Sequence, residues 1–89
     1  ATYFYTGLGN CGSWSSDSDF VVALSLAEYS GGAHCYQHVE ISYGDKTIDA
    51  TVVDSCQGCA RYDLDLSPAA FEALAPTDRG RIGIRWWYP

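Results

Sequence analysis

Four cysteines in a chain of 89 residues limit the folds that this protein can adopt. A domain of this size buries only about 60–65% of the surface that its unfolded chain exposes, so its core alone gives marginal stability. An even cysteine count in a short chain without methionine predicts two disulfides and an oxidising compartment. We expect one secreted domain over residues 1–89, already processed at its N-terminus, rather than a cytosolic protein with reduced thiols. Cys11, Cys35, Cys56 and Cys59 can pair in three ways, and their spacing does not choose among them.

The net charge restricts the partners. The formal charge is −6 and the pI is near 4.4. Nucleic-acid binding needs a basic surface, and anionic membranes repel an acidic one, so we expect neither partner. No stretch is long and apolar enough to cross a bilayer. Neutral polymers and basic partners remain, and three Trp and seven Tyr exceed what the core needs, so some aromatic rings should be exposed.

Short apolar segments separated by turn residues predict a mainly β domain. The expected strands cover residues 1–6, 20–25, 37–43, 46–54, a short segment around 63–66, and 81–88. One clear helix is expected from Ser67 to Ala75, with Ser67 as N-cap and Pro68 at the first helical position. A single helical turn is also compatible with residues 26–29. Six short strands without an open-sheet pattern predict a small closed barrel.

Three carboxylates gather in the stretch between Val52 and Pro68. A strand ends on Asp54, a Cys-x-x-Cys loop follows, and the next strand presents Asp63 and Asp65 on one face because side chains alternate along a strand. We therefore expect the functional site here. The alternative for each carboxylate is a local role, in which it caps a turn and accepts backbone N–H groups.

Other motifs in the chain lack the context that their chemistry needs. Residues 7–12 match G-x-G-x-x-G, but no helix follows to cradle a phosphate, so these glycines indicate turns. The Cys-x-x-Cys lacks the βαβ surroundings of a redox motif. A zinc site would need a second such pair, which His34 and His38 do not provide. We expect no metal, no cofactor, and surface positions for both histidines.

Several short motifs, each weak alone, occur here in a specific order. They are Ala1-Thr2-Tyr3, Gly9-Asn10-Cys11-Gly12, Val22-Ala23-Leu24-Ser25, Val39-Glu40-Ile41 after Cys35, Val52-Val53-Asp54, and Asp63-Leu64-Asp65-Leu66-Ser67 with Ala70-Phe71. Together they resemble the double-psi β-barrel family that includes the first domain of expansins, barwin and the RlpA-like proteins. Within that family, the chain resembles the single-domain secreted fungal expansin-like proteins called loosenins. The resemblance implies a six-stranded double-psi β-barrel with one short helix, and disulfides Cys11–Cys35 and Cys56–Cys59.

The resemblance also implies roles for individual residues. Asp65 falls on the carboxylate that expansins need for wall loosening, which is the general acid in the related family 45 glycoside hydrolases. Asp54 falls on a second groove aspartate and Thr2 on a groove threonine. Two departures stand out. The hydrolases' first-strand base is missing, since no acidic residue precedes Asp17, and the expansin groove tyrosine is Cys56 here.

These residues favour binding over cleavage. Glycoside hydrolysis usually needs two carboxylates about 5–5.5 Å or 6.5–9.5 Å apart across the bond. Carboxylates on one side of a groove instead raise each other's pKa values. We expect Asp65 to hydrogen-bond glycan oxygens of cellulose or chitin and loosen their packing, without a second domain. Candidate sugar-stacking side chains are Trp14, Tyr62 and Trp87, with Tyr3 or Tyr5 on the groove floor. For each of them the alternative is packing in the core. We expect core packing for Trp86 and Phe71.

Two other functions remain as alternatives. One is a protein-binding module, such as a cysteine-protease inhibitor or a defence or effector protein, because the loops and the acidic surface could serve a protein partner. The other is a hydrolase or a peptidoglycan lytic transglycosylase. The missing first-strand base argues against the hydrolase, and repulsion between anionic peptidoglycan and a chain of net charge −6 argues against the transglycosylase. The expected partner is thus a polysaccharide bound by a monomer.

Overall fold

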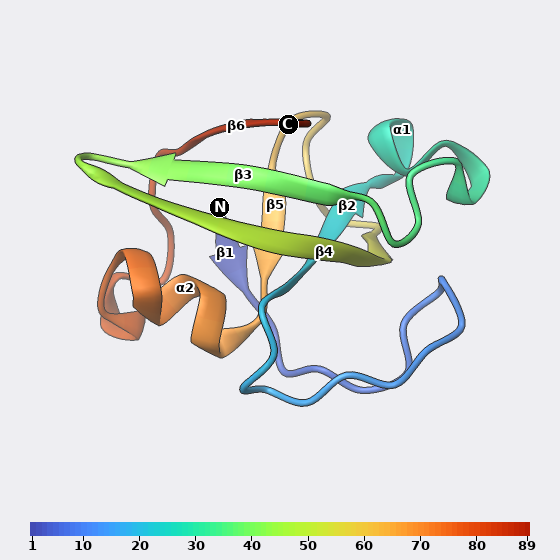
Figure 1. The fold of residues 1–89 in the computed structure, drawn as a ribbon, viewed down its shortest axis with the longest axis horizontal. Helices are drawn as coiled ribbons and strands as arrows, with labels where there is room; N and C mark the ends of the chain where they lie inside the picture. Colours follow the sequence, from blue (N-terminus) through green and yellow to red (C-terminus); the bar gives the residue numbers. More distant parts are fainter.

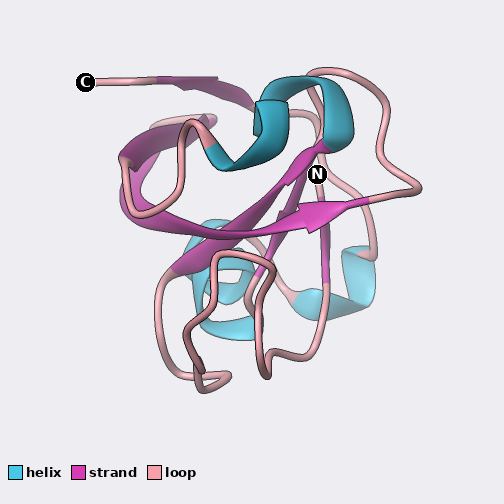
Figure 2. Cartoon of the chain, turned by 90° about the vertical axis from the view of Figure 1, so that its right-hand side faces the viewer, coloured by secondary structure: helices cyan, strands magenta, loops and turns pink.

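Six strands form one continuous sheet in the computed structural model, which describes all residues 1–89 (Figure 1). The sheet order is β1-β5-β2-β4-β3-β6. The strand bounds are β1 Thr2–Tyr3, β2 Val21–Ser25, β3 His38–Tyr43, β4 Lys46–Cys56, β5 Leu64–Leu66 and β6 Arg85–Trp87. The helices are α1 Leu26–Tyr29 and α2 Pro68–Leu74, with 3-10 turns η1 Ser30–Gly32 and η2 Thr77–Arg79. Figures 1 and 2 place α1 and α2 at opposite ends of the strands.

The sheet mixes parallel and antiparallel pairs and closes on itself. β3 and β4 form an antiparallel hairpin, whereas β4 runs parallel to β2 and β5 runs parallel to β1. Just before β1, the nitrogen of Ala1 donates to the carbonyl of Ile82 at 2.6 Å, and the Ile82 nitrogen donates back to Ala1 at 2.9 Å. This reciprocal pair joins the segment entering β1 to the segment leading to β6. The predicted double-psi β-barrel is confirmed.

Alternating side chains of the strands fill the barrel. Fully buried apolar residues come from every strand except β1 and β6: Val22, Leu24, Val39, Ile41, Val52, Leu64 and Leu66. Helix α2 covers one end, where Phe71 and Leu74 join the core. Its start follows the prediction, because Ser67 Oγ accepts from the nitrogen of Ala70 at 3.3 Å and Pro68 is the first helical residue. Burying each such apolar side chain contributes about 1.5–3 kcal/mol.

Several predicted bounds were wrong. β1 covers two residues rather than 1–6, because after Phe4 donates to Leu66 the chain leaves the sheet and packs against β4, where Cys11 donates to Val53. β6 begins at Arg85 instead of Arg81, and β4 continues to Cys56 instead of ending at Asp54.

The structure has two helices, α2 at the predicted place and α1 over residues 26–29, where the sequence also allowed a single helical turn. The additional α1 is a single turn, whose N-cap Ser25 accepts from the nitrogen of Glu28 at 3.3 Å. It ends at Ser30, whose φ of 51° lies in the left-handed region and stops the helix.

Two disulfides cross-link the fold in the predicted pattern, Cys11–Cys35 and Cys56–Cys59. The first joins the connection after β1 to the segment before β3, and the second closes a tight loop between β4 and β5. Such bonds form and persist in oxidising compartments. None of the helices has the length and apolar character needed to cross a bilayer.

Candidate functional site

A row of register partners crosses four strands on the outer face of the sheet. Thr2 of β1 lies opposite Asp65 of β5, Asp65 lies opposite Ala23 of β2, and Ala23 lies opposite Asp54 of β4. Directly opposed residues point to the same face. The neighbours of Asp65 in β5 are Leu64 and Leu66, which are buried in the core, so the row points away from it. The predicted trio Thr2, Asp54 and Asp65 therefore shares one surface, with the small Ala23 between the two carboxylates.

A β-bulge places Asp54 on this face. Val22 pairs with Val52, but the next residue of β2, Ala23, pairs with Asp54, so Val53 is one extra residue in β4. Without the bulge, alternation from the buried Val52 would turn Asp54 towards the core. A bulge re-aims the side chains that follow it, and here it turns a carboxylate outward.

The segment Gly9–Cys11 packs directly on this bulge. The Cys11 nitrogen donates to the Val53 carbonyl at 3.1 Å, and the Asn10 nitrogen donates to Asp54 Oδ1 at 2.9 Å. A Cβ atom on Gly9 would lie 2.2 Å from the Val53 carbonyl oxygen, so only glycine fits. The glycine motif thus reflects close backbone approach as well as turns.

Asp54 performs the local role that was its alternative. Its Oδ1 accepts from the nitrogen of Ser55 at 2.8 Å as well as from Asn10. The Asn10 side chain also reaches Ser55 Oγ at 2.5 Å. Asp54 therefore holds the connection after β1, at Asn10, against the end of β4.

Asp65 is half-buried and hydrogen-bonded by one neighbour in the row. Thr2 Oγ1 donates to Asp65 Oδ1 at 2.9 Å. Burial raises the pKa of Asp65 above its usual range, while the Thr2 hydrogen bond and the positive charges of the Ala1 amine and Arg81 oppose the rise. The charge of Asp54 is the smallest contribution. Burial, more than the carboxylate crowding expected from the sequence, therefore perturbs the pKa of this group.

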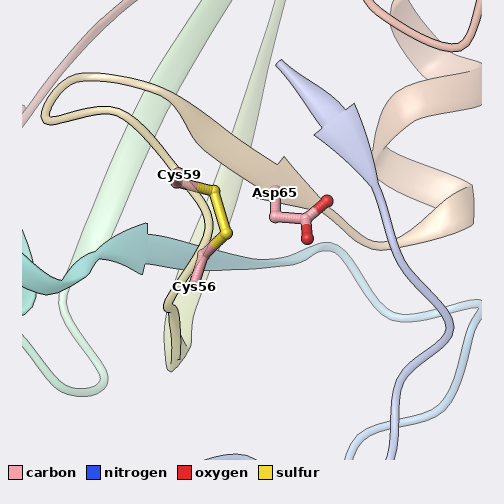
Figure 3. A group of neighbouring side chains, drawn as sticks. All are labelled: Cys56, Cys59 and Asp65. Atoms are coloured by element: carbon pink, nitrogen blue, oxygen red, sulfur yellow. A yellow bond between two sulfur atoms is a disulfide. The ribbon is translucent and has the colours of Figure 1, made fainter.

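The Cys56–Cys59 disulfide lies beside the Asp65 carboxylate (Figure 3). Both sulfurs and a carboxylate oxygen lie within 4.8 Å of one another. Because the two sulfurs are bonded to each other, they are not thiolate ligands for a metal ion. They instead present a compact apolar group beside the carboxylate. Cys56 stands at the position where the family resemblance implies the groove tyrosine of expansins.

Asp63 is engaged elsewhere. Its Oδ2 accepts from Arg81 Nη1 at 3.0 Å, and its backbone nitrogen closes a turn on Ala60. The structure thus brings two of the three predicted carboxylates into one row and gives the third an ion pair and a turn.

The aromatic candidates separate into three places. Trp14 is 77% exposed and Tyr5 is 74% exposed, both in the connection between β1 and β2. Tyr3 turns towards the core and packs on Phe71, with ring centroids 5.1 Å apart, so its ring does not line the groove floor. Tyr62 and Trp87 are exposed as expected. They line a separate pocket together with Glu28, Ile84, Trp86 and Tyr88.

Sequence reasoning missed part of that pocket and one loop carboxylate. Trp86 packs against the core as predicted, but it also lines the pocket. Glu28 joins it because residues 26–29 form a helix. Asp17 Oδ1 accepts from the backbone nitrogen and the hydroxyl of Thr6, at 2.7 and 2.8 Å, a long-range contact for which the sequence offers no local signal.

The sequence model of the family described as lytic transglycolase matches residues 19–86, more than half of the chain. The chain belongs to this RlpA-like double-psi β-barrel family. Among its relatives is a putative ripening-related protein 7 of rice (Oryza sativa subsp. japonica), 34% identical over 89 residues. That alignment covers 84% of this chain and 55% of the rice protein. The chain therefore spans about half the length of the rice protein.

Two solved structures of the family closely match the barrel. The Streptomyces papain inhibitor superposes with a TM-score of 0.85 at 39% identity, covering 96% of this chain and 86% of the inhibitor. A point mutant of Clavibacter michiganensis expansin in complex with cellohexaose gives a TM-score of 0.89 at 32% identity, covering 97% of this chain and 46% of the expansin. The expected likeness to expansins is confirmed.

Proposed function

We propose that this protein is a secreted, monomeric, loosenin-like member of the family that binds cellulose or chitin along the row of Thr2, Asp65 and Asp54 and weakens their packing without hydrolysis. The observation that carries the proposal is the half-buried Asp65 carboxylate, hydrogen-bonded by Thr2 on an outer face of the sheet. The cellohexaose complex of the structurally similar expansin supports a glucan as the ligand class.

The raised pKa of Asp65 suits hydrogen bonding to a glycan. A carboxyl group whose pKa is raised by burial stays protonated to a higher pH and can then donate to a glycan oxygen, while its ionised form accepts from hydroxyl groups. Thr2 orients one oxygen. Such bonds would replace those between neighbouring glycan chains and so loosen a fibre.

The surroundings of Asp65 support a role without hydrolysis. The other carboxylate of the row, Asp54, points to the same face and already accepts two backbone N–H groups. A hydrolase needs a second carboxylate across the glycosidic bond, as a nucleophile or to activate water. Trp14, exposed in the connection that packs on β4, supplies an aromatic face on which a sugar ring could stack.

Binding isotherms on cellulose and on chitin test the proposal. The native protein is compared with Asp65→Asn and with Asp78→Asn, a control that changes an exposed carboxylate of η2 outside the row. We expect binding to fall at least about tenfold for Asp65→Asn, since the charge-assisted hydrogen bonds of the half-buried carboxylate are lost, and to stay unchanged for the control. Equal binding of all three proteins would refute the role of Asp65.

A specific observation favours a second function, inhibition of a cysteine protease. The papain inhibitor structure matches nearly the whole chain at 39% identity. Inhibition of papain at stoichiometric protein, without binding to either polysaccharide, would replace the first proposal by this one.

A further inference from the structure

An aromatic pocket lies between three segments distant in sequence: helix α1, the loop between β4 and β5, and β6 with the residues on either side of it. These segments gather at the top of Figure 1, near the C-terminus. The pocket has a volume of about 440 Å³, within the range of known ligand sites. Its lining is Glu28, Tyr62, Ile84, Trp86, Trp87 and Tyr88. No residue of the Asp65 row lines it.

Hydrogen bonds and ring packing fix the aromatic walls. The indole nitrogen of Trp86 donates to the Tyr62 carbonyl at 2.8 Å, and that of Trp87 donates to Glu40 at 3.0 Å. Trp86 packs edge-to-face against Tyr88, with centroids 5.3 Å apart. The rings of Trp86, Trp87 and Tyr88 are therefore held in place before any ligand binds, which lowers the entropic cost of binding.

Glu28 is the one charged group in the lining. Its side chain is only 16% exposed, and its nearest cation, Arg61 Nε, lies 3.6 Å away, beyond the length of an N–H···O bond. Burial, the negative charge of Glu28 and a hydrogen bond to Glu28 raise the pKa of Tyr88, so its hydroxyl is a neutral partner of this carboxylate. A carboxylate that is partly removed from water, and whose nearest cation lies beyond hydrogen-bond length, favours a ligand that brings its own positive N–H donors.

Arg61 shows which ligand chemistry the pocket accepts. Its guanidinium carbon lies 5.5 Å from the centre of the Tyr62 ring, and the same side chain approaches Glu28. This side chain is 64% exposed, so it occupies the rim and is able to swing into solvent. Arg61 thus contacts both the Tyr62 ring and the Glu28 carboxylate. A guanidinium from another protein would use the same two groups.

We propose that this pocket binds an arginine side chain of a protein partner. The guanidinium would stack on the aromatic rings and pair with Glu28, displacing Arg61. The net charge of −6 would attract a basic partner over a longer range. A sugar ring fits less well, because its hydroxyls need both donors and acceptors, whereas the indole N–H groups of Trp86 and Trp87 already bind the chain itself.

Tryptophan fluorescence titrations with the capped tripeptide acetyl-Ala-Arg-Ala-amide test the proposal. The matched control ligand replaces Arg with citrulline, which keeps the shape and removes the charge. We expect saturable binding of the Arg peptide, at least about tenfold weaker binding of the citrulline peptide, and weakening with added salt. Equal affinity for the two peptides, or no binding of either, would overturn the proposal.

Protein variants locate the site. Glu28→Gln should weaken binding of the Arg peptide at least about tenfold, because the paired charge is lost. Glu72→Gln, which changes an exposed carboxylate of α2 outside the pocket, should not. Arg61→Gln should tighten binding, because it removes the internal competitor.

Two results would contradict this placement. One is unchanged binding by Glu28→Gln that keeps the native circular dichroism spectrum. The other is a fluorescence response to cellohexaose in the absence of any response to the Arg peptide. If Tyr62→Ala abolished that response, the pocket would be assigned to glycans.

Discussion

The hydroxyl of Thr2 donates to the carboxylate of Asp65 at 2.9 Å, across the parallel pair β1 and β5. The two residues are 63 positions apart in sequence, yet this bond sets the orientation of the most perturbed acidic side chain in the protein. It stabilises the ionised form of Asp65, while burial stabilises the protonated form. Among the groups that favour the ionised form of Asp65, the Thr2 hydroxyl makes the largest contribution.

Replacing Thr2 should raise the pKa of Asp65 further. Thr2→Val keeps the shape and removes the donor that favours the carboxylate. Carboxyl carbon chemical shifts followed by NMR over pH would report the change. Thr47→Val, at the exposed end of the β3–β4 hairpin, is the matched control and should leave the pKa of Asp65 unchanged. A pKa that falls or stays constant in Thr2→Val would show that the hydroxyl does not stabilise the ionised form.

The raised pKa of Asp65 also predicts how stability depends on pH. In the unfolded chain this group should titrate near its ordinary pKa of 3.8, and in the folded protein at higher pH. The folded state therefore holds the proton more tightly between these two values, so stability falls as pH rises through that window and then levels off. Asp65→Asn removes this loss.

Urea unfolding of native protein and Asp65→Asn from about pH 3 to pH 8 measures the effect. The free energy of unfolding of the variant relative to the native protein should increase with pH across the window. A relative free energy that does not change with pH would mean that the folded-state pKa of Asp65 is not raised.

Gly9 should tolerate no side chain. A Cβ atom there would lie 2.2 Å from the Val53 carbonyl oxygen, which is fixed within the β4 bulge. Gly9→Ala should lower the free energy of unfolding by about 1–3 kcal/mol through overpacking. Gly7→Ala is the control, because a Cβ atom there meets nothing within 4 Å. Equal stability of the two variants in urea would contradict the close packing.

The two disulfides should contribute unequally to stability. In the chain-entropy model, the long loop closed by Cys11–Cys35 contributes about 3.5 kcal/mol and the short loop closed by Cys56–Cys59 about 2 kcal/mol. Double serine variants of each pair, compared by urea unfolding, should show that order. If the Cys56–Cys59 pair were worth more, its packing beside Asp65 would matter more than loop closure.

Local patterns in the sequence predicted the start of α2 and the face on which Asp65 lies. The start of α2 at Ser67 and Pro68 follows from capping and backbone preferences, which act within a few residues. The face of Asp65 follows from alternation along β5. The disulfide pairing and the placing of Thr2 and Asp65 in one groove came from the family resemblance, because spacing alone cannot bring distant residues together. The hydrogen bond between Thr2 and Asp65 was not predicted.

The remaining features depend on tertiary contacts. The Val53 bulge has no local signature, since the run of residues 51–53 reads as an ordinary strand. The early end of β1 follows from the connection that packs on that bulge, with Cys11 bonded to Val53. The aromatic pocket forms only where α1 and β6 lie close together, and the sequence of neither segment predicts that contact.

The most direct test is a paired measurement on cellulose and chitin fibres with native protein and Asp65→Asn. It records fibre loosening, by sedimentation or mechanical extension, together with released reducing sugar. Loosening by the native protein that is lost in Asp65→Asn, with no sugar released by either, is the predicted result. Sugar release that depends on Asp65 would contradict it and make the protein a hydrolase, and equal loosening by both proteins would remove Asp65 from the mechanism.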